Sequence, residues 1–168
     1  MHGVRGRAVG LMVLGLLTMT GYAEPATARA EDGAPELSAT LDGRPIPVED
    51  VGRYYCDDFD YPAIRCYSTK LLAGTRATLV TLLTTVDYVT VYDGTNYSGA
   101  YMNVSQDYAT LSTIGWNDRI SSFKARNSET GTLFADWFFT GTWWAFCCNT
   151  QVANLGSYSN TFSSLQRT

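Results

Sequence analysis

Histidine and lysine are the residue types that this sequence has least of. Its 168 residues include one histidine, His2, and two lysines, Lys70 and Lys124. We expect residues 1–30, which include His2, to be removed, so the mature protein offers no Ser-His-Asp or Cys-His catalytic arrangement, no His-Glu-x-x-His zinc motif and no cage of histidine ligands. The net charge is -4, whereas binding to nucleic acid depends mainly on Lys and Arg at the phosphates. Histidine-based enzymes are excluded, and nucleic-acid binding is not expected.

Charged residues are also few, whereas aromatic residues are frequent. The chain is 17% charged, 13% aromatic and 45% hydrophobic. That much apolar side chain is enough to build a core, so disorder of the whole chain is not expected. Aromatic and threonine side chains pack well on a pleated surface. The composition predicts one all-β domain with some additional chain, and it disfavours a helical bundle.

The first thirty residues have the pattern of a secretory signal peptide. A basic start that includes Arg5 and Arg7 precedes the apolar run 8–19, and small-x-small cleavage patterns follow within 26–30. The apolar run is too short for a membrane span, which takes roughly 20 residues. We expect residues 1–30 to be removed and the protein to be secreted (extracellular, bacterial), without a membrane anchor.

Four cysteines are present, at Cys56, Cys66, Cys147 and Cys148. In an exported protein they predict two disulfides, for which three pairings are possible. A bond between adjacent residues strains the peptide between them. We therefore favour bridges that join the Cys56 and Cys66 segment to Cys147 and Cys148. Neither pair has the two-residue spacing of a zinc site.

The chain before residue 84 divides into two parts. Residues 31–47 are polar and contain proline without periodicity, which predicts a flexible leader. Residues 48–83 predict an N-terminal extension packed on the domain. Within it, leucines at helical spacing over residues 70–86 compete with a threonine-rich composition that favours strand. We expect a short helix beside the sheet.

Three acids in the extension, Asp57, Asp58 and Asp60, are candidates for a cation site or for a pair of glycosidase carboxylates. Acids in a short polar loop are normally solvated, and the nearby cysteines indicate a loop that they tie down. We therefore expect a solvated loop, no metal at these residues, no catalytic residues and no enzymatic activity.

The second half of the chain is an internal repeat. Shifting the sequence by 42 residues without a gap superposes aromatic, glycine and serine positions in one register. Such a fixed period is the mark of two copies of one supersecondary unit. The matched pairs include Thr90 with Thr132, Tyr92 with Phe134, Tyr97 with Phe139, Gly99 with Gly141, Tyr101 with Trp143, Trp116 with Tyr158, Asp118 with Asn160, and Ile120 with Phe162.

Each copy predicts a β-hairpin followed by a later strand. In the first copy, Asp93 to Asn96 has the composition of a turn between two strands. Gly99 and Gly141 stand where a ring folds over the hairpin or where φ is positive. One unit of this kind cannot bury its apolar face alone, so two units are expected to face each other.

These motifs resemble those of the βγ-crystallin family. Its Greek-key unit carries aromatic-x4-aromatic-x-Gly, which matches Tyr92 to Gly99 and Phe134 to Gly141. Its calcium-binding microbial members add Asn/Asp-Asn/Asp-x-x-Ser/Thr-Ser, which matches residues 117–122 in full. The resemblance covers residues 84–168 and implies two Greek-key motifs, about 84–126 and 126–168, that form a βγ-crystallin-like sandwich.

The resemblance also implies two sites for Ca²⁺, an ion that accepts carbonyl, hydroxyl and carboxylate oxygens. In the first copy the implied ligands are Asn117, Asp118, Ser121 and the carbonyls of Arg119 and Asp93. In the second copy they are Asn160, Ser163 and the carbonyls of Thr161 and Ala135. Ser159 replaces the family's Asn or Asp, and Asn160 brings no charge. We expect one tighter site and one site that is weaker or absent.

The sequence is compatible with three hypotheses about function. The first is a secreted, non-enzymatic calcium-binding protein that the ion and disulfides stabilise. The second is a secreted metalloproteinase inhibitor of crystallin fold, with a protease as partner, although no reactive loop can be identified. The third is a toxin-like module or one that binds cell-wall polysaccharide through exposed tryptophans, for which Trp137 and one of Trp143 or Trp144 are the candidates.

Overall fold

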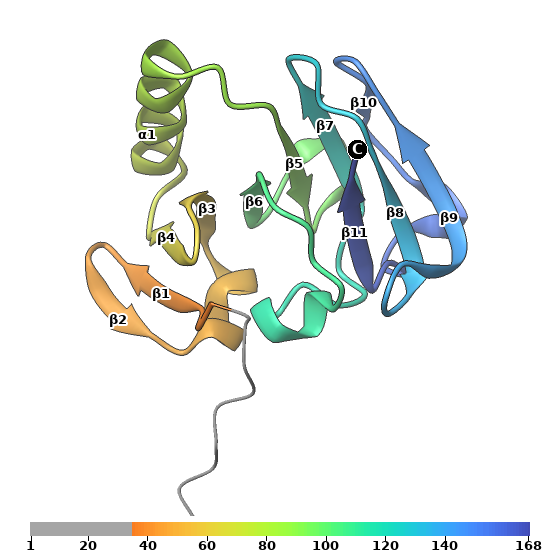
Figure 1. Cartoon of the computed structure of the whole chain (residues 1–168), viewed down its shortest axis with the longest axis horizontal. Helices are drawn as coiled ribbons and strands as arrows, with labels where there is room; N and C mark the ends of the chain where they lie inside the picture. The colour runs from red at the N-terminus through yellow and green to blue at the C-terminus, as the bar shows by residue number, and fades with distance from the viewer. Residues whose placement is uncertain (1–34) are drawn as a thin grey trace, which may run out of the picture. The chain divides into compact units, whose positions relative to one another are not determined.

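A computed structural model describes residues 35–168 of the protein (Figure 1). The expected signal peptide, residues 1–30, lies outside the described residues. The strands are β1 (Ser38–Leu41), β2 (Arg44–Ile46), β3 (Tyr55–Asp60), β4 (Ala63–Tyr67), β5 (Tyr88–Tyr92), β6 (Tyr101–Val104), β7 (Ser122–Arg126), β8 (Gly131–Asp136), β9 (Thr140–Phe146), β10 (Gln151–Val152) and β11 (Ser164–Arg167). The helices are α1 (Lys70–Leu83) and the short 3₁₀ helices η1 (Val48–Arg53), η2 (Thr95–Tyr97), η3 (Leu111–Ile114) and η4 (Gly156–Tyr158).

The strands form two sheets that exchange segments between the two repeats. One sheet has the order β10-β7-β5-β6-β3-β4-β1-β2, and the other has the order β11-β8-β9. The second repeat sends β10 to pair with β7 of the first. In return, Tyr108 of the first repeat bridges to Leu165 on β11 of the second. Each repeat is therefore a Greek key with one segment in the partner's sheet, and the predicted all-β sandwich is confirmed.

The core lies between the two sheets and includes side chains of both repeats. Trp116, Phe123 and Phe162 are completely buried in it. Along β5, Val89 and Val91 enter this core, and Tyr88, Thr90 and Tyr92, which alternate with them, face the opposite side of the sheet, as the period of two in a strand requires. Burying one large apolar side chain contributes roughly 1.5–3 kcal/mol. Neither repeat could assemble such a core alone.

The N-terminal extension continues the first sheet beyond the repeats. Strand β3 pairs in parallel with β6, and β4 joins β3 to β1. The expectation of a flexible leader over residues 31–47 is wrong from Ser38 onward, because β1 and β2 lie in that segment. The short strand β1 is held there by its buried Ala39, which packs in the main core with Ile64 of β4.

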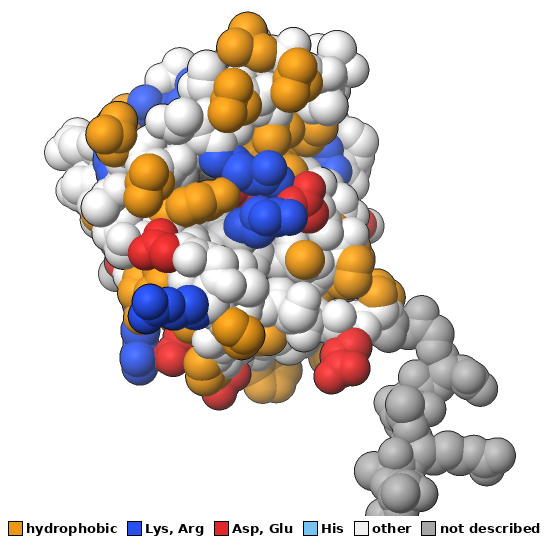
Figure 2. All heavy atoms as spheres, turned by 90° about the vertical axis from the view of Figure 1, so that its left-hand side faces the viewer, with side chains coloured by type: hydrophobic (Ala, Val, Ile, Leu, Met, Phe, Trp, Pro, Cys, Tyr) orange, Lys and Arg blue, Asp and Glu red, His pale blue; other side chains and the backbone are white. Residues whose placement is uncertain are grey.

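Helix α1 confirms the short helix expected beside the sheet. The side chain of Thr69 caps its first turn by accepting a hydrogen bond from the Leu72 amide over 3.4 Å. Ala73 is buried against Tyr92 and Tyr101 on the outer face of the sheet, whereas all five leucines of the helix are exposed. Figure 2 shows hydrophobic side chains on the surface over this helix. The exposed ones are Leu71, Leu72, Leu79, Leu82 and Leu83. No helix within residues 35–168 has the length and apolar character needed to cross a membrane.

The preferred cysteine pairing is wrong. Cys56 on β3 is bonded to Cys66 on β4, whereas Cys147 and Cys148 are free and exposed. The reason is strand register, because Cys56 and Cys66 are direct partners in the antiparallel β3–β4 pair. Cross-strand partners have side chains close enough for a bond.

The expectation of a solvated acidic loop is also wrong. Asp57 and Asp58 belong to β3 and are only 1% and 0% exposed. Asp57 lies 3.5 Å from the Nε of Arg76 on α1, and Asp58 accepts hydrogen bonds from Ser105 and Tyr108. Burial raises the pKa of each carboxyl to about 6, although these partners act in the opposite direction. The partners compensate part of the cost of burying the two acids.

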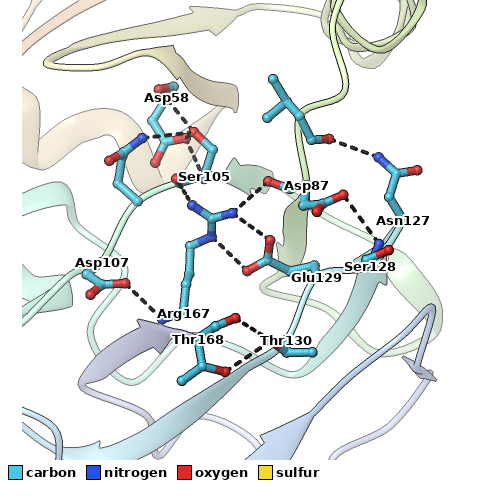
Figure 3. Close-up of polar contacts among 12 residues, drawn as sticks. Asp58, Asp87, Ser105, Asp107, Asn127, Ser128, Glu129, Thr130, Arg167 and Thr168 are labelled. Atoms are coloured by element: carbon cyan, nitrogen blue, oxygen red, sulfur yellow. Dashed lines mark hydrogen bonds and ion pairs between the residues drawn. The ribbon is translucent and has the colours of Figure 1, made fainter.

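A second buried ionic contact joins the C-terminal strand to the rest of the domain (Figure 3). Arg167 on β11 binds the carboxylate of Glu129 through two bonds of 2.7 Å, and Glu129 is only 2% exposed. The same guanidinium donates to the carbonyls of Asp87, at 2.9 Å, and Ser105. A two-pronged contact of this kind is strong and specific in geometry.

Candidate metal centre

The two hairpins of the repeats are built by the same side-chain contacts. Ser122 donates its hydroxyl to the carbonyl of Gly94, and Ser164 donates its hydroxyl to the carbonyl of Asp136, both over 2.6 Å. Each serine also accepts a backbone N–H from the second aromatic residue of the motif, which is Tyr97 at 3.1 Å in one copy. In the other copy it is Phe139 at 3.0 Å. The serine that follows each loop therefore fixes the hairpin of its own copy.

Backbone conformation repeats along with these contacts. Gly99 and Gly141 have φ of 76° and 80°, a region that favours glycine. A Cβ atom on Gly99 would lie 1.9 Å from Oδ1 of Asp93, and one on Gly141 would lie 2.4 Å from Oδ2 of Asp136. Glycine is required here as expected, and the group that folds against it is a carboxylate.

The two candidate loops, residues 117–122 and 159–164, exchange backbone hydrogen bonds across the domain. The amide of Asp118 donates to the carbonyl of Phe162, and the amide of Asn160 donates to the carbonyl of Ile120, both over 2.9 Å. Asp118 and Asn160 also share a left-handed backbone conformation, with φ of 53° and 60°. Each loop thus places its central acid or amide beside the end of the other loop.

This exchange regroups the predicted ligands. The hydroxyl of Ser163 lies 3.4 Å from Oδ1 of Asp118, and the hydroxyl of Ser121 lies 2.9 Å from Oδ1 of Asn160. The grouping expected within each copy is therefore wrong for these four side chains, because each serine faces the acid or amide of the other copy. The motif spacing could not show this, since it describes one copy at a time.

The predicted carbonyl ligands follow the same exchange. Thr161 directly precedes Phe162, which binds the Asp118 amide, and Ala135 follows Phe134, which binds the Ser163 amide. In the other set, Arg119 and Asp93 take the equivalent positions beside Ile120 and Tyr92. The first set thus contains Asp118, Ser163 and the carbonyls of Thr161 and Ala135. The second contains Asn160, Ser121 and the carbonyls of Arg119 and Asp93.

Several of these carbonyls are free to bind an ion. Within residues 35–168, the carbonyl oxygens of Asp93, Arg119 and Thr161 accept no hydrogen bond. Ala135 lies at the irregularity between Phe134 and Asp136 in the β8–β9 pairing. Free carbonyls beside a hydroxyl and a carboxylate or amide are the oxygen types that Ca²⁺ accepts. The donor set therefore fits this ion.

Asn117 holds the Asp118 carboxylate in place. Its Nδ2 donates to Oδ2 of Asp118 over 2.7 Å, and its Oδ1 accepts the indole N–H of Trp137 over 3.0 Å. Both ends of its amide are therefore engaged. The motif predicts Asn117 as a ligand, whereas its contacts place it to orient Asp118. Its contact with Trp137 could not be found from motif spacing.

Arg119 makes the two sets electrostatically unequal. Its guanidinium donates to Oδ2 of Asp93 over 2.9 Å and to the carbonyl of Gly115 over 3.2 Å. The side-chain charge of Asp93 is thus already matched, and a positive group stands beside the set that contains Asn160. Only the set with Asp118 has an uncompensated carboxylate.

Residues 35–168 hold no cluster of three or more His, Cys, Asp or Glu side chains suited to a metal.

Exposed aromatic rings gather on the β8–β9 hairpin, next to the Asp118 set. Trp137, Phe138 and Trp143 are 51%, 67% and 61% exposed. Trp144 is partly buried, with its ring centroid 5.2 Å from that of Tyr158. This confirms the expectation that Trp137 and one of Trp143 and Trp144 are exposed.

Comparison with known proteins finds crystallin domains among solved structures. No family model and no curated protein matches the chain. A βγ-crystallin from Ciona intestinalis is 20% identical, with 48% of this chain and 99% of that chain covered and a TM-score of 0.45. An archaeal βγ-crystallin is 22% identical, with 49% and 99% covered and a TM-score of 0.44. A clostrillin double mutant in complex with nickel is 28% identical, with 48% and 95% covered and a TM-score of 0.42.

The fold itself is evident from the strand pairing of this chain. Strands β7, β5 and β6 of one repeat correspond to β11, β8 and β9 of the other, and each repeat gives one segment to the opposite sheet. The serine contacts and the positive φ angles recur at the positions that the repeated motifs indicate. Residues 84–168 thus have the fold of a βγ-crystallin domain, as their motifs predict.

Proposed function

We propose that this protein is a secreted, non-enzymatic calcium-binding protein, in which the ion and the Cys56–Cys66 disulfide stabilise a βγ-crystallin-like domain. One observation carries the proposal. The exchanged loops bring the Asp118 carboxylate to the hydroxyl of Ser163, beside the free carbonyl of Thr161. Calcium takes six to eight oxygen ligands of mixed type, and waters can complete the set.

Calcium at these residues would connect the two repeats. Asp118 belongs to the first repeat, whereas Ser163, Thr161 and Ala135 belong to the second. An ion that binds only the folded arrangement raises the free energy of unfolding by RT ln(1 + [L]/Kd), about 2.7 kcal/mol at a 100-fold excess over Kd. The proposed role of the ion is therefore to fasten one Greek key to the other.

Thermal melting of the purified protein tests the proposal. The melting temperature is expected to rise in millimolar calcium and to return to its starting value when a chelator is added. Magnesium is the control ion, because its strict octahedral preference makes this mixed set a poor site for it. Equal melting temperatures in calcium and in chelator would overturn the proposal.

A second candidate function is binding to cell-wall polysaccharide, which the exposed rings of Trp137, Phe138 and Trp143 favour. Aromatic faces can stack on sugars, and rings with a polar group, such as tryptophan, are enriched at binding interfaces. Co-sedimentation with purified cell-wall polysaccharide, with Trp143→Ala as the variant, tests this candidate. No loop within residues 35–168 is singled out as a protease-binding loop, so the inhibitor hypothesis gains no support.

A further inference from the structure

A cavity lies between helix α1 and the outer face of the first sheet. Its volume is about 300 Å³, and strands β5, β6 and β7 line its floor. The cavity exists because α1 turns small residues, Gly74 and Ala77, toward it. A Cβ atom on Gly74 would meet no atom within 4 Å. This volume is at the lower end of the range for small-molecule sites.

Three positive side chains meet at this cavity. Lys70 and Arg126 line it, and Lys124 is their neighbour on the same face. The pKa of Lys124 is lowered by partial burial and by the positive charges of Arg126 and Lys70. Lys70 and Lys124 are the two lysines of the whole chain, so in a protein of net charge -4 they lie together.

None of these three cations has an acidic partner. Among the ion pairs of residues 35–168, none involves Lys70, Lys124 or Arg126. The Nε of Arg126 is buried and has no hydrogen-bond partner in the described part of the chain. Lys70 and Lys124 instead lie over tyrosine rings, at 6.0 Å from the centroid of Tyr92 and 3.8 Å from that of Tyr97. A buried guanidinium nitrogen without a partner is costly unless a ligand satisfies it.

The acids of β3 that contact helix α1 are already balanced. Asp57, beside Tyr101, lies 3.5 Å from the Nε of Arg76. Arg76 also binds Asp60 over 2.7 Å, and Asp60 in turn pairs with Arg65. These two acids and two arginines thus neutralise each other. The positive charge of Lys70, Lys124 and Arg126 is not neutralised by them.

The floor of the cavity supplies neutral hydrogen-bond donors. The pKa values of Tyr88 and Tyr101 are raised, chiefly by burial, so their hydroxyls stay protonated at neutral pH. Thr90 donates its hydroxyl to Oδ1 of Asn103 over 2.8 Å. The Nδ2 of Asn103 then remains as a donor with no partner among residues 35–168.

We propose that this cavity binds a small organic oxyanion, a phosphate or carboxylate attached to a hydroxylated body. The oxyanion would accept a hydrogen bond from the guanidinium of Arg126. Its negative charge would neutralise the positive charge of Arg126, Lys70 and Lys124. The hydroxylated body would lie against the tyrosines and bind Asn103 and the tyrosine hydroxyls. None of the residues that line this cavity is a predicted calcium ligand.

Titration of the purified full-length protein tests the proposal, with glucose 6-phosphate, glucuronate, inorganic phosphate and glucose as probes. Glucose 6-phosphate and glucuronate are expected to bind, inorganic phosphate more weakly, and uncharged glucose not measurably. Loss of one charge-assisted hydrogen bond in Arg126→Gln should weaken binding by about 10- to 100-fold. Arg53→Gln, which removes an exposed arginine, should leave binding unchanged.

Two further measurements keep the test decisive. Lys124→Gln removes a partly exposed charge from the same face and is expected to weaken binding even if Arg126→Gln fails to fold. Binding should also decline as salt rises, because the attraction is between charges. The proposal is overturned if none of the anions binds, or if binding survives both substitutions. Equal affinity for phosphate and glucose 6-phosphate would contradict the contacts to the hydroxylated body.

Discussion

The hydroxyl of Ser163 lies 3.4 Å from Oδ1 of Asp118, across the boundary between the two repeats. At the equivalent place, the hydroxyl of Ser121 lies 2.9 Å from Oδ1 of Asn160. The two arrangements therefore differ in one group, which is a carboxylate at Asp118 and an amide at Asn160. Calcium affinity rises with the charge of the ligands, so this one difference ranks the two sets. It gives a physical basis for the predicted pair of a tighter and a weaker site.

Asn160→Asp is expected to strengthen the weaker set. The substitution adds a carboxylate beside Ser121 and the carbonyls of Arg119 and Asp93, and calorimetry should then show a second calcium ion bound, or tighter binding overall. Asn149→Asp is the matched control, because Asn149 is exposed and has φ of 66° against 60° for Asn160. If both variants bind calcium like the original protein, the second set is not a calcium site.

Removal of the Cys56–Cys66 bond is expected to destabilise the protein. The loop that the bond closes has a sequence separation of 10, and cross-links over short loops contribute about 2–3 kcal/mol. Urea denaturation of Cys56→Ala/Cys66→Ala should show this loss, whereas Cys147→Ser/Cys148→Ser should change the stability by less than about 0.5 kcal/mol. Thiol titration of the unfolded, unreduced protein should find the two free thiols of Cys147 and Cys148. Finding no free thiol would contradict the pairing of Cys56 with Cys66 alone.

Arg167→Leu should be among the most damaging single substitutions. It leaves the Glu129 carboxylate buried without its partner, which typically costs about 3–5 kcal/mol. Arg53→Leu breaks the exposed pair with Asp50 and should cost less than about 1 kcal/mol. The double variant Arg167→Leu/Glu129→Leu should recover part of the loss. Equal unfolding free energies for the two single variants would show that the buried pair has no special role.

Stability is expected to fall as the pH rises from about 4 to about 6. Burial raises the pKa of Asp57 from 3.8 to about 6 in the folded protein, so in this window the folded state binds more protons than the unfolded state. The free energy of unfolding then decreases with pH, by up to about 1.4 kcal/mol per unit for one such group. Asp58 acts in the same direction. The lowered pKa of Asp60 acts only below its ordinary value of 3.8.

Urea denaturation at several pH values, with Asp57→Asn as the variant, checks this dependence. The variant cannot ionise at this position, so its stability should decline less between pH 4 and 6 than that of the original protein. Identical pH profiles for the two proteins would show that Asp57 does not titrate in this window.

The repeat could be predicted because the contacts that define it stay within one copy and recur in the other. Gly99 and Gly141 need positive φ within their own hairpins, and Ser122 and Ser164 each bind a hairpin of their own copy. Such requirements leave a pattern at a fixed spacing. The helix over residues 70–83 was likewise within reach, since it follows from periodicity along a single element.

The features that escaped prediction depend on strand register or on contacts between elements that no single motif spans. The pairing of Asp118 with Ser163 arises from the exchange of loops, and the burial of Asp57 arises from α1, which brings Arg76 over β3. The Cys56–Cys66 bond follows from strand register. Strands β1 and β2 are too short to show an alternation, and they exist because the edge of β4 receives them.

The most direct test of the calcium site is calorimetric titration of calcium into the Asp118→Ala variant. Because Asp118 is the uncompensated carboxylate of the two sets, the variant should lose most of the calcium binding of the original protein. Glu36→Gln removes one exposed negative charge elsewhere and should bind calcium as before. Unchanged calcium binding by the Asp118→Ala variant would contradict the assignment.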